Sequence, residues 1–260
     1  MGKRTSYRPG TFSWVDLATT DGPAAKAFYA GLFGWEMEDN DAGGGAVYTT
    51  CRLDGDAVAG LYEMTEEMRA TGAPANWLSY VTVADADGAV ARVRELGGGA
   101  IDDAFGVLDV GRMAVLNDPQ GAVLAVWEPR SRIGAERVNG VGCLCNNELA
   151  TSDLDAACSF YADAFGWTTE RIDTGPGGPE IVAAYNDGTL NANFSAARPG
   201  EPPHWRVYFG VESTKAAIER VRELGGTALL EPVPVPAGSF AIARDPHGAV
   251  FALFAGEFDP

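Results

Sequence analysis

The sequence contains only two histidines, His204 and His247, in 260 residues. Because imidazole is the commonest metal ligand in proteins, this number excludes a metal centre built on several histidines. His247 lies in a turn, where we expect it to be exposed. The four cysteines lack the paired spacing of a zinc or disulfide framework. We interpret them as structural thiols and place Cys143 and Cys145 on one face of a strand.

Positive charge and long apolar runs are also scarce. The formal net charge is −17, from 19 Lys and Arg against 36 Asp and Glu. Nucleic-acid binding needs Lys and Arg to neutralise phosphates, and an anionic membrane surface would repel this chain. No apolar run is long enough to span a bilayer, and the first residues resemble no signal segment. We therefore expect a cytoplasmic protein whose partner is a small molecule, with no nucleic acid and no membrane.

Three short blocks of sequence each occur twice, which is the clearest feature that is present. The first has six of eight positions identical at an offset of 160 − 28 = 132, and the other two have offsets of 128 and 127. The pairs are residues 28–35 and 160–167, 92–98 and 220–226, and 118–123 and 245–250. This regular spacing indicates a duplicated domain. We place domain 1 at residues 1–129, a charged linker at 130–139 and domain 2 at 140–260.

Hydrophobic periodicity predicts four successive β-α-β-β(-β) units, two in each domain. In the first unit a strand at residues 12–18 precedes a helix that Asp21 caps and Gly34 ends. Asp54-Gly55 is a strong signal for a two-residue hairpin. In the second unit we predict one strand over residues 107–117. The segment 231–236 has three prolines and must be an edge strand or a loop, because proline has no backbone donor.

The repeated FYxxxFGW helix ends and DPxGA turns resemble the vicinal oxygen chelate superfamily, which includes glyoxalase I, bleomycin-resistance proteins and extradiol dioxygenases. The chain is most similar to two-domain actinobacterial glyoxalase-like proteins that are often labelled hydroxylases, some of which accompany antibiotic clusters. The resemblance implies an α+β fold of tandem βαβββ units. Each of its two domains is a curled, eight-stranded mixed sheet with outer helices. In this superfamily the hollow of the sheet holds a ligand, often at a divalent metal.

The resemblance also identifies the positions where family members carry their metal ligands. In domain 1 these are Trp14, Leu78, Ala125 and, by a looser alignment, Gly60. In domain 2 they are Asn146, Arg206, Ala252 and a residue near Asn193. Neither set suits zinc, nickel or iron, which require imidazole, thiolate or carboxylate ligands. We therefore predict no metal and no other cofactor.

Strand alternation points Asp16 and its repeat counterpart Glu148 into the two hollows, because Val15 and Leu17 must face the helix. A buried carboxyl has a raised pKa and can act as a general base, so both are our catalytic candidates. Asp16 could instead be solvated at the mouth of the hollow. Arg206 could pair with Glu148 or receive an anionic ligand. The ligand-binding candidates are Trp14, Tyr48, Leu78, Tyr80, Met113, Asn146, Arg206 and Tyr208.

These residues leave the function open among three hypotheses. The first is a metal-free protein that binds a hydrophobic or aromatic small molecule, either sequestering it or assisting antibiotic biosynthesis. The second is an enzyme of secondary metabolism with lyase, isomerase, cyclase or hydroxylase-type activity, which uses an inward carboxylate and tyrosine for proton transfer. The third is a metal-dependent glyoxalase or dioxygenase with displaced ligands. We expect a monomer or a weak homodimer.

Overall fold

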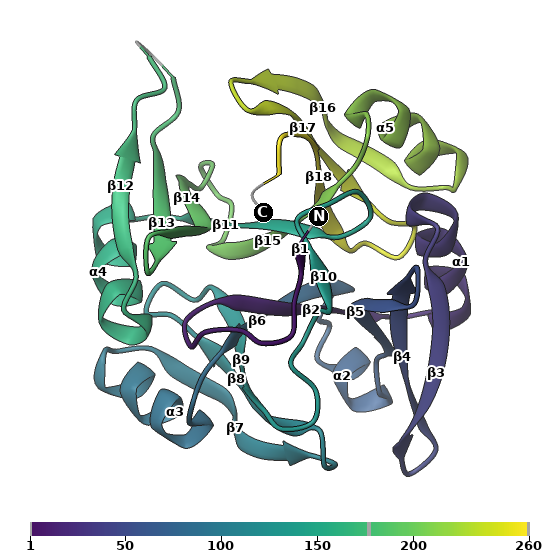
Figure 1. Ribbon diagram of the computed structural model, residues 1–260, viewed down its shortest axis with the longest axis horizontal. Helices are drawn as coiled ribbons and strands as arrows, with labels where there is room; N and C mark the ends of the chain where they lie inside the picture. The colour runs from purple at the N-terminus through teal and green to yellow at the C-terminus, as the bar shows by residue number, and fades with distance from the viewer. Residues whose placement is uncertain (1, 176–177, 259–260) are drawn as a thin grey trace.

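The computed structural model describes residues 2–175 and 178–258. Within them the chain forms two eight-stranded sheets, a two-stranded ribbon and five helices (Figure 1). This confirms the predicted α+β fold of tandem βαβββ domains. None of the helices in the described part is long and apolar enough to cross a membrane.

The first sheet has the strand order β3-β4-β5-β2-β6-β9-β8-β7. Two β-α-β-β-β units supply four strands each, and they join where β2 pairs antiparallel with β6. The pairs β2–β5 and β6–β9 are parallel, so the sheet is mixed. Its strands are β2 (Phe12–Thr19), β3 (Glu36–Gly43), β4 (Ala46–Leu53), β5 (Asp56–Glu63), β6 (Asn76–Thr82), β7 (Gly99–Val107), β8 (Gly111–Asn117) and β9 (Val123–Pro129).

The second sheet repeats this arrangement with the order β12-β13-β14-β11-β15-β18-β17-β16. Its proline-rich strand β16 lies at the edge, which confirms the constraint set by its missing backbone donors. Its strands are β11 (Leu144–Thr151), β12 (Thr168–Ile172), β13 (Ile181–Asn186), β14 (Thr189–Ala196), β15 (His204–Gly210), β16 (Thr227–Val235), β17 (Gly238–Arg244) and β18 (Val250–Gly256).

The helices begin and end largely where the sequence signals stand. The carboxylate of Asp21 accepts a hydrogen bond from the Ala24 N–H at the start of the first helix, and Gly34 ends that helix in the left-handed conformation. Asp153 and Gly166 have the same roles in domain 2. The helices are α1 (Gly22–Phe33), α2 (Glu66–Ala70), α3 (Ala86–Glu95), α4 (Leu154–Phe165) and α5 (Thr214–Glu223). The short α2 has no counterpart among the predicted elements.

Two large hydrophobic cores each take side chains from both sheets. One contains Leu17 of β2 together with Phe251 of β18, and the other contains Val81 of β6 together with Leu149 of β11. The two sheets therefore pack against each other. Helix α1 contacts α5, and α3 contacts α4, at the two sides of the molecule (Figure 1).

Buried hydrogen bonds between the domains come from the repeated sequence blocks. Tyr29 of α1 donates to Asp245 of the second DP-x-G turn at 3.1 Å. Its counterpart Tyr161 donates to Asp118 of the first turn at 3.0 Å. The blocks that reveal the duplication therefore also join its two halves.

The opposite face of each sheet carries a separate, smaller apolar cluster. We call the face bearing Trp14, Asp16, Leu78 and Tyr80 the first cup, and the face bearing Asn146, Glu148, Arg206 and Tyr208 the second cup. Tyr80 is only 4% exposed and Ala125 is fully buried, although the other sheet lies on the far side. The curl of the first sheet therefore encloses these residues.

Three sequence-based predictions of local structure are wrong. Residues 107–117 form the end of β7, a turn and then β8, because Leu108 takes a left-handed conformation (φ 46°) that no glycine signals. The predicted common face of Cys143 and Cys145 is absent, because the register of β11 shifts after Leu144. Cys143 consequently lies in the core between the sheets, and Cys145 lies in the second cup. His247 is only partly exposed, and its Nε2 atom is buried.

The predicted linker is more ordered than its charged composition suggests. Within it, the short strand β10 (Arg137–Val138) pairs with β1 (Gly2–Lys3) near the chain start. Arg137 also bonds Asp54 and Asp56 of the β4–β5 hairpin. The exact domain limits stay a prediction, but this segment is attached to domain 1.

Candidate functional site

The polar centre of the first cup is Asp16. Strand register places it directly opposite Gly60 of β5 on one side and Leu78 of β6 on the other. Trp14, two residues earlier on the same face, lies opposite Tyr80, and Tyr80 lies opposite Ala125 of β9. The sheet therefore brings the predicted inward residues of domain 1 into one compact patch.

Asp16 is a buried carboxyl with one oxygen bonded and one oxygen free. Its Oδ2 atom accepts a hydrogen bond from the Tyr80 hydroxyl at 2.8 Å and a longer one from the Tyr48 hydroxyl at 3.4 Å. Its Oδ1 atom is buried and has no partner among the described residues. Only 3% of the residue is exposed, which rules out the solvated alternative. Burial raises the pKa of this carboxyl from 3.8 to about 7, against the lowering effect of the two tyrosines.

Tyr48 is held in place from two sides. The Trp14 indole N–H donates to the Tyr48 hydroxyl at 2.8 Å. On the neighbouring strand β5, Gly60 leaves room for this hydroxyl, because a Cβ atom at Gly60 would lie 1.9 Å from it. Burial and the Asp16 charge raise the pKa of Tyr48 and Tyr80 well above 10, so both phenols stay protonated and can donate.

The rest of the first cup is an apolar wall. Aromatic rings and aliphatic side chains from β2, β6, β7, β8 and β9 form this wall, and they include Met113, one of the predicted ligand-binding residues. The cluster comprises Trp14, Leu78, Tyr80, Val107, Val110, Met113, Ala125 and Trp127. Such a surface, with a few fixed polar groups, is typical of sites for small organic molecules.

Sequence reasoning missed a second polar group at the first cup. Thr50 of β4 accepts hydrogen bonds from Asn40 at 3.1 Å and from the Arg132 guanidinium at 3.0 Å. Arg132 belongs to the predicted linker, so no strand periodicity could reveal that its side chain returns to the sheet.

The second cup has the same register but a different chemistry. Glu148 lies opposite Asn193 and Arg206, and Asn146 lies opposite Tyr208. Both Glu148 oxygens have partners. Oε1 accepts from the Ser195 hydroxyl at 2.6 Å, and Oε2 accepts from Tyr208 and from Arg206 at 2.9 Å.

Arg206 also contacts two residues besides Glu148. It bonds Glu201 at 3.3 Å and lies 2.8 Å from the Nε2 atom of His204. Only its Nε atom is buried without a partner among the described residues. The pairing of Arg206 with Glu148, rather than a free cationic site, is what the structure shows.

The positions that correspond to family metal ligands lack the required donor atoms in the first cup. Trp14, Gly60, Leu78 and Ala125 do converge on the Asp16 patch, but none offers an imidazole, a thiolate or a carboxylate. Within residues 2–175 and 178–258, no three His, Cys, Asp or Glu side chains come together in a way that could hold a metal ion. The residues present do not fit a chelated cation.

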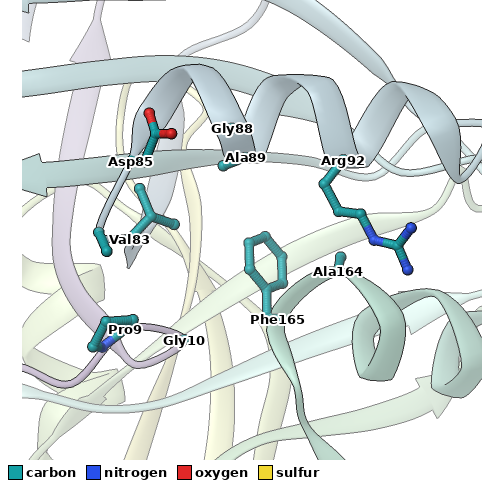
Figure 2. A pocket seen from close by; sticks show the side chains of 10 residues that line it. Pro9, Gly10, Val83, Asp85, Gly88, Ala89, Arg92, Ala164 and Phe165 are labelled. Atoms are coloured by element: carbon teal, nitrogen blue, oxygen red, sulfur yellow. The ribbon is translucent and has the colours of Figure 1, made fainter.

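A surface hollow of about 270 Å³ lies outside both cups, between the start of α3 and the end of α4 (Figure 2). Phe165 points into it, and Arg92 reaches across to donate to the Asp163 carbonyl at 3.1 Å. The Gly10 carbonyl at its border accepts from the Trp167 indole. These contacts join the two domains, so the hollow lies where the domains meet.

The fold and the repeated cups define a class of protein, and comparison of the sequence with known protein families identifies that class. Residues 11–126 and 143–253 both match the Glyoxalase/Bleomycin resistance protein/Dioxygenase superfamily. The chain belongs to that superfamily, with one match in each half.

Several individual proteins are similar to this chain over most of its length. The chain is 40% identical over 255 residues to "Putative glyoxylase CFP32" of Mycobacterium tuberculosis, covering 97% of each protein. It is 36% identical over 266 residues to "Anthracycline biosynthesis protein DnrV" of Streptomyces peucetius, covering 96% of this chain and 94% of that protein. Among solved structures, the Mn(II)-bound glyoxalase from Novosphingobium aromaticivorans is similar with a TM-score of 0.65 and 17% identity, over 97% of this chain and 84% of that one. At that identity the similarity concerns the fold.

Proposed function

We propose that the first cup binds an aromatic small molecule without the help of a metal ion. The observation that carries this proposal is the Oδ1 atom of Asp16, which is buried and has no hydrogen-bond partner within residues 2–175 and 178–258, in a carboxyl that Tyr48 and Tyr80 contact. An unpaired buried carboxyl oxygen costs about 1–3 kcal/mol, so a ligand that supplies a hydrogen bond recovers that energy. The flat apolar wall favours a ring system.

The second cup is, by contrast, a less suitable binding site than the first. Glu148 has a hydrogen-bond partner on each oxygen. A ligand there would have to displace an existing ion pair, whereas a ligand at Asp16 would meet a buried carboxyl oxygen that has no partner among the described residues. Two Streptomyces relatives carry the name anthracycline biosynthesis protein, and anthracyclines are polycyclic aromatic compounds. An accessory role in making or holding such a compound is consistent with the cup.

A thermal-shift screen of aromatic and polyketide-like metabolites tests this proposal. A ligand at 100 times its dissociation constant stabilises the native state by about 2.7 kcal/mol, which gives a clear shift. Asp16→Asn should reduce the shift and Glu148→Gln should leave it intact, because only the first cup is expected to bind. Shifts that respond to Glu148→Gln and not to Asp16→Asn would contradict the proposal.

A second function, proton transfer within a bound ligand, is favoured by the pKa of Asp16. With a pKa near 7, this carboxyl can take a proton from one ligand atom and return it to another at neutral pH. Such a transfer serves isomerase, lyase or cyclase chemistry without an oxidant. Turnover that survives Asp16→Asn would exclude this role and leave the binding function standing.

A further inference from the structure

The predicted linker closes one end of the first cup. Arg132 donates its backbone N–H to the Val110 carbonyl before β8, and its own carbonyl accepts from the Trp127 indole at 2.9 Å. Further along, Ala135 and Glu136 donate to the carbonyls of Ser13 and Ala57 at 2.7 Å each. The segment 130–136, which we call the strap, therefore runs past the ends of β8, β9, β2 and β5.

The strap directs the Arg132 side chain back onto the sheet. One nitrogen, Nη1, donates to Thr50, and the guanidinium forms no ion pair within 4.0 Å among the described residues. Its charge also acts on Glu38, whose pKa is lowered mainly by Arg52 and to a smaller extent by Arg132. The Arg132 Nε and Nη2 atoms have no hydrogen bond among the described residues and are not among the buried atoms without a partner. These donors consequently remain accessible. In the second cup, by contrast, Arg206 is neutralised by Glu148 and Glu201.

Strand register gives the separation between Asp16 and Thr50, the residue that Arg132 contacts. Thr50 is opposite Gly60, and Gly60 is opposite Asp16. Neighbouring strands are about 4.8 Å apart, so Thr50 and Asp16 are separated by roughly 10 Å along the sheet. A molecule with two fused or linked aromatic rings spans this distance. The positive charge of Arg132 is also unusual in this protein, because the whole chain carries a net charge of −17.

We infer that Arg132 is a specificity-determining residue of the first cup, which selects aromatic ligands carrying an anionic oxygen. The inference rests on the proposed binding function and defines its ligand class. One end of the ligand forms a hydrogen bond with the Asp16 Oδ1 atom. The other end places a carboxylate, sulfonate or phenolate against the Arg132 guanidinium. Guanidinium groups bind such oxygens through charge-assisted hydrogen bonds.

Two fluorescent probes with one ring skeleton test this inference. 8-Anilinonaphthalene-1-sulfonate is anionic, and N-phenyl-1-naphthylamine is its neutral analogue without the sulfonate. Arg132→Gln should weaken binding of the anionic probe about tenfold and change the neutral probe less than about twofold, since an accessible charged hydrogen bond is lost. Arg132→Lys should restore part of the difference, because it keeps the charge. Arg130→Gln, at an exposed neighbour, is the matched control and should alter neither affinity.

The outcomes separate this inference from the proposed function. Leu78→Trp should fill the first cup and abolish binding of both probes, because Leu78 lies beside Asp16. If both probes respond to Leu78→Trp but Arg132→Gln affects them equally or not at all, the role of Arg132 is refuted and the binding function stands. If neither probe responds to Leu78→Trp, the proposed binding function itself is contradicted.

Discussion

At the scale of single residues, the first cup depends on five residues that constrain one another. Asp16 keeps one oxygen free because Tyr48 and Tyr80 both bond the other. Tyr48 can approach only because position 60 is a glycine, and Trp14 fixes its hydroxyl. The patch is therefore organised before any ligand arrives, which reduces the entropic cost of binding.

The first prediction concerns the pH dependence of stability. The pKa of Asp16 rises from 3.8 to about 7 on folding, so the native state binds this proton more tightly than the unfolded chain does. The free energy of unfolding should therefore fall as the pH rises from about 4 to about 7 and then level off. At about 1.4 kcal/mol per pKa unit, the ionisation costs on the order of 4 kcal/mol.

Urea unfolding of the wild type and of Asp16→Asn between pH 4 and pH 8 measures this effect. The difference between the two proteins isolates Asp16, since the other titrating groups cancel. We expect the variant to gain stability relative to the wild type as the pH rises. A difference that is constant across this range would show that Asp16 titrates normally.

A second residue-scale prediction concerns Gly60. A methyl group there would collide with the Tyr48 hydroxyl and would lie 3.0 Å from the Asp16 Cβ atom. Gly60→Ala should displace Tyr48 and weaken probe binding about tenfold, the loss expected for one hydrogen bond and some packing. Gly106→Ala in β7 is the matched control, because a Cβ atom there would meet nothing within 4 Å. Equal binding by the two variants, measured by fluorescence titration, would refute the role of Gly60.

At the scale of elements, the sequence predicts the helices and strands of the repeated blocks because their signals are local. Asp21 and Gly34 cap α1, and the prolines of β16 confine it to an edge, so the sequence alone predicts these elements. The orientation of Asp16 also follows from strand alternation. What depends on tertiary structure was missed: the irregular register of β11, and the return of Arg132 from the strap to β4.

The third prediction concerns the hydrogen bonds that join helices of one domain to turns of the other. Tyr29 donates to Asp245 and accepts from the Trp77 indole at 3.0 Å, all in buried surroundings. Tyr29→Phe would leave both partners unsatisfied and should lower the free energy of unfolding by about 2–4 kcal/mol. Tyr161→Phe, at the equivalent position, should cost a similar amount.

Tyr185→Phe provides the control for these two changes. The Tyr185 hydroxyl forms no hydrogen bond among the described residues, so its removal should cost little. Urea unfolding of the three variants gives the comparison. If Tyr29→Phe were as stable as Tyr185→Phe, the bonds between the domains would contribute nothing to stability.

At the scale of the whole molecule, duplication has produced two cups with the same backbone and different chemistry. The shared cores join the domains, and residues of both sheets contribute to each core. In the second cup Glu148 and Arg206 pair with each other, and only the Arg206 Nε atom is buried without a partner among the described residues. In the first cup, the Asp16 Oδ1 atom has no partner among those residues and Arg132 forms no ion pair with any of them. We therefore expect one ligand per chain, in the first cup.

Crystallography of the protein soaked with 8-anilinonaphthalene-1-sulfonate tests this asymmetry most directly. We expect one probe molecule in the first cup, with its amine near the Asp16 Oδ1 atom and its sulfonate at Arg132. Density for the probe in the second cup, or only in the hollow between α3 and α4, would contradict the assignment of the first cup as the binding site.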